Sequence, residues 1–135
     1  MTVTNFFKLY AVALPTFLVM DLIWLGVVAR SFYQGQMGHL MRAHVNWAAA
    51  IAFYLLFVAG IVVLAVWPAV ERQSFTHALA LGALLGLVTY AAYDLTNLAT
   101  LEGFPLKVAL VDLAWGTVLC ATVSAVTYRV SLRLI

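Results

Sequence analysis

Four long apolar runs divide this chain of 135 residues, and each run is long enough to cross a lipid bilayer as a helix. The hydrocarbon core of a bilayer requires about 20 predominantly apolar residues in helical conformation. Short polar connectors separate the runs. We therefore expect an all-α, four-helix transmembrane bundle with both termini on the same side. The expected spans cover about residues 6–29, 45–67, 77–101 and 108–128.

The composition supports a membrane solvent for most of the chain. Hydrophobic residues make up 66% of the sequence and charged residues only 9%, whereas soluble domains carry roughly a quarter charged residues. No linker or shift in composition divides the chain, so we expect a single integral membrane domain over residues 1–135. The seven basic residues are scattered singly, which argues against a nucleic-acid partner. Membrane lipid is the expected surrounding partner.

Local signals refine the expected helices. The run after Lys8 continues to about Val28 without a small-x-small cleavage site before Arg30, so it is interpreted as a retained first span rather than a signal peptide. Pro68 is expected to end the second span at Trp67. In the first connector, Phe32 and Tyr33 are interpreted as aromatic residues at the membrane interface, and the connector has room for a short helix lying on the membrane.

Small residues in the third span predict a close helix contact. Gly82 and Gly86 form a small-xxx-small pair, which allows another helix to approach closely. This pair is a candidate contact for a homo-oligomer or a membrane partner. Cys120 is the only cysteine, and it is expected to be a small buried residue without a disulfide.

The third span also carries the most informative polar residues. At about 100° per residue, Tyr90, Tyr93, Asp94 and Asn97 lie on one stripe of the helix. A charge in the bilayer core costs from about 3 to over 10 kcal/mol. Asp94 must therefore be paired, protonated, hydrated or functional.

Two further carboxylates are expected at the depth of Asp94. Asp21 lies late in the first span, and Asp112 lies early in the fourth. Because the spans alternate in direction, all three fall in the same half of the bilayer, roughly 6 to 12 Å below the same surface. Trp24 and Trp115 follow Asp21 and Asp112 by one turn, so each shares a face with its carboxylate. The pattern predicts a polar pocket open to one side of the membrane.

Three short motifs carry a resemblance to a known family. They are Tyr93-Asp94-Leu95-Thr96-Asn97 and the two Asp-x-x-Trp motifs at Asp21–Trp24 and Asp112–Trp115. Together they resemble a family of small bacterial four-span membrane proteins catalogued as a domain of unknown function, over essentially the whole chain. The resemblance implies a bacterial cytoplasmic (inner) membrane location and a four-helix architecture. It implies no activity, so the catalytic residues are unknown.

The repeated Asp-x-x-Trp motif has two interpretations: an inverted repeat of the kind found in transporters, or a shared packing role. Orientation rests on the basic residues. With the termini inside, four lie inside and three outside, which favours cytoplasmic termini. The inner group is Lys8, Arg72, Arg129 and Arg133, and the outer group is Arg30, Arg42 and Lys107.

The polar residues leave several functions open. They can form hydrogen bonds that only hold the helices together. Alternatively, clustered carboxylates without a basic partner at the same depth are expected to hold a proton that exchanges for a small cationic or lipidic ligand, in a binding or transport site. Trp24, Trp115, Tyr90 and Tyr93 would then enclose the cation through their ring faces.

A third hypothesis is an intramembrane enzyme that carries out acid/base chemistry on an isoprenoid or fatty-acyl lipid, since paired carboxyl groups can donate and accept protons. A fourth hypothesis is a structural subunit of a membrane complex. No cofactor or metal is expected, because His39 and His44 lie five apart in a connector rather than in a zinc-binding helix motif. Binding or transport is the favoured function, and the residues expected to hold the ligand or carry protons are Asp21, Asp94, Asp112, Trp24, Trp115, Tyr90, Tyr93 and Asn97.

Overall fold

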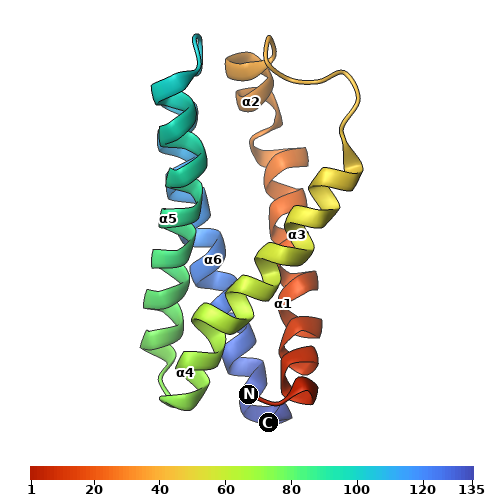
Figure 1. Ribbon diagram of the computed structural model, residues 1–135, viewed down its shortest axis with the longest axis vertical. Coiled ribbons are helices and arrows are strands. Elements are labelled where there is room, and N and C mark those ends of the chain that lie inside the picture. Colours follow the sequence, from red (N-terminus) through yellow and green to blue (C-terminus); the bar gives the residue numbers. More distant parts are fainter.

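The computed structural model describes residues 1–135 as an all-helical bundle without strands (Figure 1). Two of the long helices contain a π-helical turn, labelled η. The elements are α1 (Val3–Ile23), η1 (Trp24–Val28), α2 (Arg30–Met37), α3 (Trp47–Ile61), η2 (Val62–Val66), α4 (Trp67–Glu71), α5 (Phe75–Thr100) and α6 (Leu106–Leu134).

Four continuous helical stretches are long and apolar enough to cross a membrane, which confirms the predicted fold class. They cover Val3–Val28, Trp47–Glu71, Phe75–Thr100 and Leu106–Leu134. The stretches alternate in direction, and both termini lie together at one end of the bundle (Figure 1). We call this the terminal end. The opposite end, which carries α2 and the α5–α6 connector, is called the cavity end.

Side-chain caps fix where three of the helices begin. The side chains of Thr2, Asn46 and Ser74 each accept a hydrogen bond from the backbone N–H three residues later, at 3.1 to 3.2 Å. These bonds satisfy donors that the first turn of a helix leaves free. At the α5–α6 connector, Gly103 adopts a φ of 76°, a conformation that glycine reaches at little cost.

The second span does not end at Trp67, as Pro68 suggested, but continues to Glu71. Pro68 lies one residue beyond η2, near the start of α4. Proline has no N–H to continue the helical hydrogen bonds, and the π-helical turn before it accommodates this local irregularity within a continuous helix. Pro68 therefore marks a change in helical winding rather than a stop.

The small residues of α5 are used for packing within the chain. A Cβ atom added to Gly82 would lie 2.6 Å from the carbonyl oxygen of Cys120 and 2.8 Å from Cβ of Ser124, and one added to Gly86 would collide with the backbone of Gly116. The expected close approach is therefore made by α6 of the same chain. Both glycines are buried, so an oligomer or membrane partner would have to use another face.

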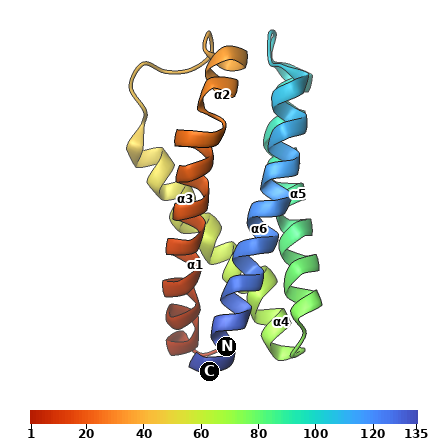
Figure 2. The same cartoon turned by 180° about the vertical axis from the view of Figure 1, so that it is seen from behind.

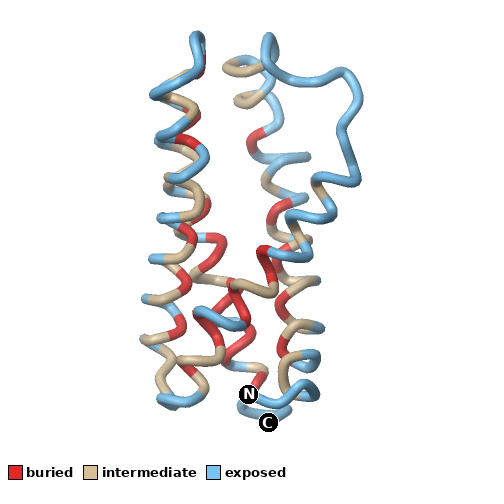
Figure 3. The backbone as a smooth tube through the Cα atoms, viewed as in Figure 1, coloured by how far each residue is buried: buried red, intermediate tan, exposed pale blue.

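The terminal half of the bundle is solidly packed. Its core combines side chains from α1, α3, η2 and α6, and buried residues gather there in Figure 3. Most of them are fully inaccessible to solvent. This core consists of Leu9, Ala13, Phe17, Phe57, Val58, Ile61, Val62, Val66, Leu119, Cys120 and Val123.

The cavity half is more open, because α3 crosses the bundle diagonally (Figure 1). Seen from behind, α6 lies beside both α1 and α5, and α3 passes on the far side of them (Figure 2). α5 packs on η2 and α4, at the terminal end, rather than on α3. As α3 diverges, side chains at its start such as Trp47 and Ile51 are left exposed. This divergence leaves space between the helices at the depth of the carboxylates.

Candidate functional site

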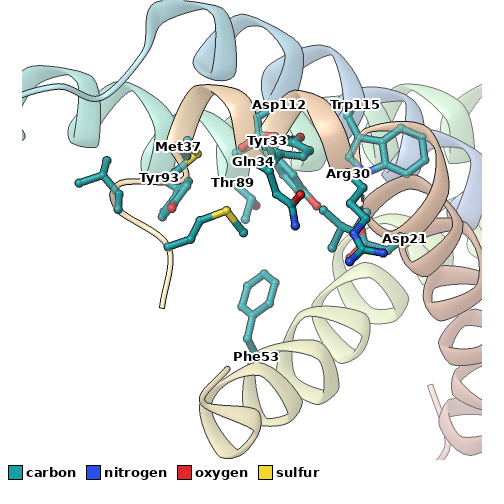
Figure 4. Close-up of a pocket in the computed structure, with 15 residues that line it drawn as sticks. Asp21, Arg30, Tyr33, Gln34, Met37, Phe53, Thr89, Tyr93, Asp112 and Trp115 are labelled. Atoms are coloured by element: carbon teal, nitrogen blue, oxygen red, sulfur yellow. Dashed lines mark hydrogen bonds between the residues drawn. The ribbon is translucent and has the colours of Figure 1, made fainter. Parts of the chain in front are cut away.

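A cavity of about 840 Å³ lies in the cavity half of the bundle (Figure 4). Its walls come from α1, η1 and α2 on one side and from α5 and α6 on the other, while Phe53 faces them from α3. Cavities of about 300 to 1,000 Å³ are typical of small-molecule sites. The lining residues are Asp21, Leu25, Gly26, Arg30, Tyr33, Gln34, Met37, Leu40, Met41, Phe53, Thr89, Tyr90, Tyr93, Asp112 and Trp115.

Five of the eight residues proposed from the sequence lie in this lining, namely Asp21, Tyr90, Tyr93, Asp112 and Trp115. The other three lie outside it. Trp24 packs behind Trp115, Asp94 is fully buried, and Asn97 is half-buried one turn beyond Tyr93. The structure thus divides the proposed set into cavity walls and supporting side chains.

Asp21 joins three helices through its two oxygens. The hydroxyl of Tyr54 in α3 donates to Oδ2 at 2.8 Å, and Nε1 of Trp115 in α6 donates to Oδ1 at 3.2 Å. The residue is 5% exposed, so these donors replace most of the water that the carboxylate would otherwise bind. Asp21 is therefore held in one position at the wall of the cavity.

Asp112 is held in a similar way from α2. The hydroxyl of Tyr33 donates to Oδ1 of Asp112 and accepts a hydrogen bond from Nε1 of Trp24 at 3.2 Å. Tyr33 does not act as an interfacial residue, as the sequence suggested, because its ring turns inward to reach Asp112. Its neighbour Phe32 packs beside the buried Phe104.

The environment of Tyr33 keeps its hydroxyl a donor. Burial raises the pKa of this phenol above its ordinary value of about 10, and the hydrogen bond to Asp112 acts in the same direction. The phenol is therefore protonated throughout the physiological range. Its proton fixes the direction of the chain of hydrogen bonds from Trp24 to Asp112.

The two Asp-x-x-Trp motifs are connected to each other in a reciprocal way. The rings of Trp24 and Trp115 stack with centroids 4.4 Å apart and planes 7° from parallel. Trp115 of α6 donates to Asp21 of α1, while Trp24 reaches Asp112 of α6 through Tyr33. Each tryptophan thus supports the carboxylate of the opposite helix, which gives the repeated motif a shared packing role.

Asp94 differs from the other two carboxylates. It is fully buried, and neither of its oxygens has a hydrogen-bond partner. Its carboxyl group lies beside that of Asp112, close enough for the two to interact directly. An isolated ionised carboxylate at such a position costs several kcal/mol. A proton shared with Asp112 would give Asp94 the hydrogen bond that the surrounding protein does not supply.

The cavity lining presents carboxylate and hydroxyl oxygen atoms and the faces of aromatic rings, without the clustered ligands that a metal ion needs. No three His, Cys, Asp or Glu side chains converge as they would around a metal ion. The lining is otherwise apolar or aromatic, with the amide of Gln34 and the guanidinium of Arg30 near the carboxylates (Figure 4). The arrangement is chemically suited to hold a cation against carboxylates and rings.

Comparison with protein families matches residues 6–129 to one described as "Predicted membrane protein (DUF2177)". The match covers nearly the whole chain and all four spans. The chain belongs to this family. Its description gives a membrane protein of unknown function. No curated protein and no solved structure matches the chain.

The cavity-lining residues of η1 and α2 were not predicted from the sequence. Gly26, Arg30, Tyr33, Gln34 and Met37 all line the cavity. Four of them, Arg30, Tyr33, Gln34 and Met37, follow one another by three, one and three residues, which places them on one face of α2, a signal present in the sequence. The first connector was predicted to hold a short helix lying on the membrane rather than a wall of the bundle. The expectation that no basic residue lies near the carboxylates is thereby corrected.

Proposed function

We propose that this membrane protein binds a cationic amphiphile within the membrane, with the positive charge held between Asp21 and Asp112. One observation carries the proposal: both carboxylates line a single cavity together with the rings of Tyr90, Tyr93 and Trp115. A desolvated cation is attracted both to carboxylates and to the faces of aromatic rings.

The carboxylates can accept further hydrogen bonds from such a ligand. Each oxygen of Asp21 accepts one hydrogen bond from the protein, whereas a carboxylate oxygen can accept two. Arg30 is the only cation in the lining, and its side chain is exposed and forms no ion pair with either carboxylate. A ligand cation would therefore find acceptors that are fixed in position and incompletely used.

The packed terminal half favours binding over passage. The core around Phe17, Ile61 and Leu119 is fully buried and apolar, and buried residues gather toward the terminal end in Figure 3. A cation crossing it would lose its polar partners at a cost of several kcal/mol. We therefore place the function of the site on one side of the membrane.

Equilibrium binding of tritiated dodecylamine tests this proposal. The protein is reconstituted in phosphatidylcholine nanodiscs, and the signal of empty nanodiscs is subtracted. We expect saturable binding that unlabelled dodecylamine displaces and that dodecanol and laurate do not, because only the amine is cationic. The double variant Asp21→Asn/Asp112→Asn should bind at least about tenfold more weakly, a loss of about 1.4 kcal/mol.

Glu102→Gln is the control for loss of a carboxylate away from the cavity, since Glu102 lies in the exposed α5–α6 connector. This variant should bind like wild type. Equal displacement by dodecanol would show that the chain alone is recognised and would contradict the proposal. Unchanged affinity in the double variant would contradict it as well.

A second candidate function, intramembrane acid/base catalysis on a lipid, is favoured by the Asp94–Asp112 pair. Two adjacent carboxyl groups that share a proton can act as acid and base in one reaction. Catalysis predicts that cells lacking the protein accumulate a lipid that wild type removes and Asp94→Asn does not. If Asp94→Asn restores the wild-type lipid profile while dodecylamine binding holds, the binding function stands and the catalytic one does not.

For the location, we infer a bacterial cytoplasmic membrane with both termini in the cytoplasm. Four basic residues lie toward the terminal end, and three, Arg30, Arg42 and Lys107, lie toward the cavity end. The imbalance of four against three follows the positive-inside rule, so the cavity would open toward the outer leaflet. Fusion of alkaline phosphatase to the C-terminus tests this orientation, and an active fusion would contradict it.

A further inference from the structure

A second, shallower groove of about 500 Å³ continues from the cavity along the outside of the bundle. It lies between α3–η2 and α5, and it shares Phe53 and Thr89 with the cavity lining. Apart from Thr89, no polar side chain lines it. The remaining lining residues are Leu56, Phe57, Ala59, Gly60, Val63, Leu64 and Leu85.

The length and direction of the groove match one lipid chain. From Phe53 to Leu64 a helix rises about 16 Å, which is about half of the roughly 30 Å hydrocarbon core and therefore about one leaflet. The groove joins the cavity at Phe53 and Thr89, and it follows α3, which runs toward the terminal end in Figure 1. An amphiphile with its charged group in the cavity would direct its chain along this path.

We propose that the groove seats the single hydrocarbon chain of a membrane-resident amine whose cationic group lies in the cavity. The inference rests on the proposed function and adds the place of the ligand's hydrocarbon chain, which lies in the groove. The divergence of α3 from α5 provides lateral access, since the groove faces the lipid and joins the cavity without an intervening helix.

Gly60 allows the groove to be filled without disturbing the bundle. A Cβ atom added to Gly60 meets no atom within 4 Å, so Gly60→Phe places a ring in the groove rather than in the core. Gly35→Phe is the matched control, because Gly35 also has nothing within 4 Å of an added Cβ atom and lines neither the cavity nor the groove.

The test compares two amines that differ only in chain length. Dodecylamine and butylamine are titrated into wild type, Gly60→Phe and Gly35→Phe in nanodiscs, and binding is followed by intrinsic tryptophan fluorescence. Because the added ring takes up the space that a long hydrocarbon chain would fill, Gly60→Phe should weaken dodecylamine binding at least about tenfold and leave butylamine within about twofold. Gly35→Phe should leave both affinities unchanged.

The outcomes separate this inference from the proposed function. If Gly60→Phe changes neither affinity, or weakens both equally, the chain does not occupy the groove and the inference is overturned, while the cation site stands. If neither amine binds wild type, the proposed function itself fails.

Native mass spectrometry of the same samples detects a second copy of the chain. A wild-type dimer that Gly60→Phe dissociates would assign the groove to helix packing and would also overturn the inference.

Discussion

Replacing Asp21 tests whether one carboxylate holds three helices together. Asp21→Ala removes the acceptor of the Tyr54 hydroxyl, at 2.8 Å, and of Trp115 Nε1, at 3.2 Å. Each donor left without a partner costs about 1 to 3 kcal/mol in soluble proteins, while interhelical polar contacts in membranes average about 0.6 kcal/mol. Between these limits, we expect the free energy of unfolding to fall by about 2 kcal/mol.

Asp21→Asn should cost about half as much, because the amide keeps one acceptor oxygen and presents an NH₂ group to the other donor. The free energies are measured by titrating sodium dodecyl sulfate into mixed micelles and following helix content. A double-mutant cycle of Asp21→Ala with Tyr54→Phe isolates the α1–α3 contact. We expect a coupling of about 0.6 to 1 kcal/mol. A coupling of zero, with Asp21→Ala as stable as wild type, would refute the role of Asp21 as a link between helices.

Two further predictions concern packing and pH. Gly82→Val should lower the free energy of unfolding by about 1 to 3 kcal/mol, since its Cβ atom would lie 2.6 Å from the Cys120 carbonyl oxygen. Gly60→Val is the control, because an added Cβ atom meets open space there, and it should cost less than about 1 kcal/mol. Equal losses of the two variants in micelle unfolding would contradict the packing of Gly82 against α6. Because burial raises the pKa of Tyr33, the native state keeps this proton above about pH 10 while the unfolded state loses it. The contribution of Tyr33 to stability is thus complete below about pH 10 and declines as pH rises further. Tyr33→Phe should remove that decline, and an unchanged pH profile would argue against a buried phenol.

Much of the architecture could be predicted from the sequence, because lipid offers no hydrogen-bond partners for an unpaired backbone. Spans of about 20 apolar residues must be helical, and alternating directions fix which ends meet. These rules placed Asp21, Asp94 and Asp112 in the same half of the bundle. They did not distinguish Asp94, which is enclosed beside Asp112, from Asp21, which faces the cavity. That difference depends on helix rotation, which hydropathy does not encode.

Other features depend on tertiary geometry. The diagonal course of α3 creates the space for the cavity, and nothing in the uniformly apolar run from Trp47 onward predicts its tilt. Trp24 was expected to help enclose a ligand, yet it stacks on Trp115 and donates to the Tyr33 hydroxyl, while Trp115 lines the cavity and donates to Asp21. Such pairing across helices requires knowledge of which faces meet. The wall residue Arg30 was within reach, because its spacing from Tyr33, Gln34 and Met37 is that of one face of a helix.

The most direct test of the cation site uses the stacked tryptophans as the reporter. In the variant Trp47→Phe/Trp67→Phe, Trp24 and Trp115 are the only tryptophans left, and Trp115 lines the cavity. An amine brominated on its hydrocarbon chain, near the charged group, should quench their fluorescence saturably, and unlabelled dodecylamine should reverse the quenching. Adding Gly26→Phe, which fills the cavity from η1 without an internal clash, should abolish the saturable part. Quenching that rises linearly with amine concentration, and equally in both proteins, would contradict a ligand site in the cavity.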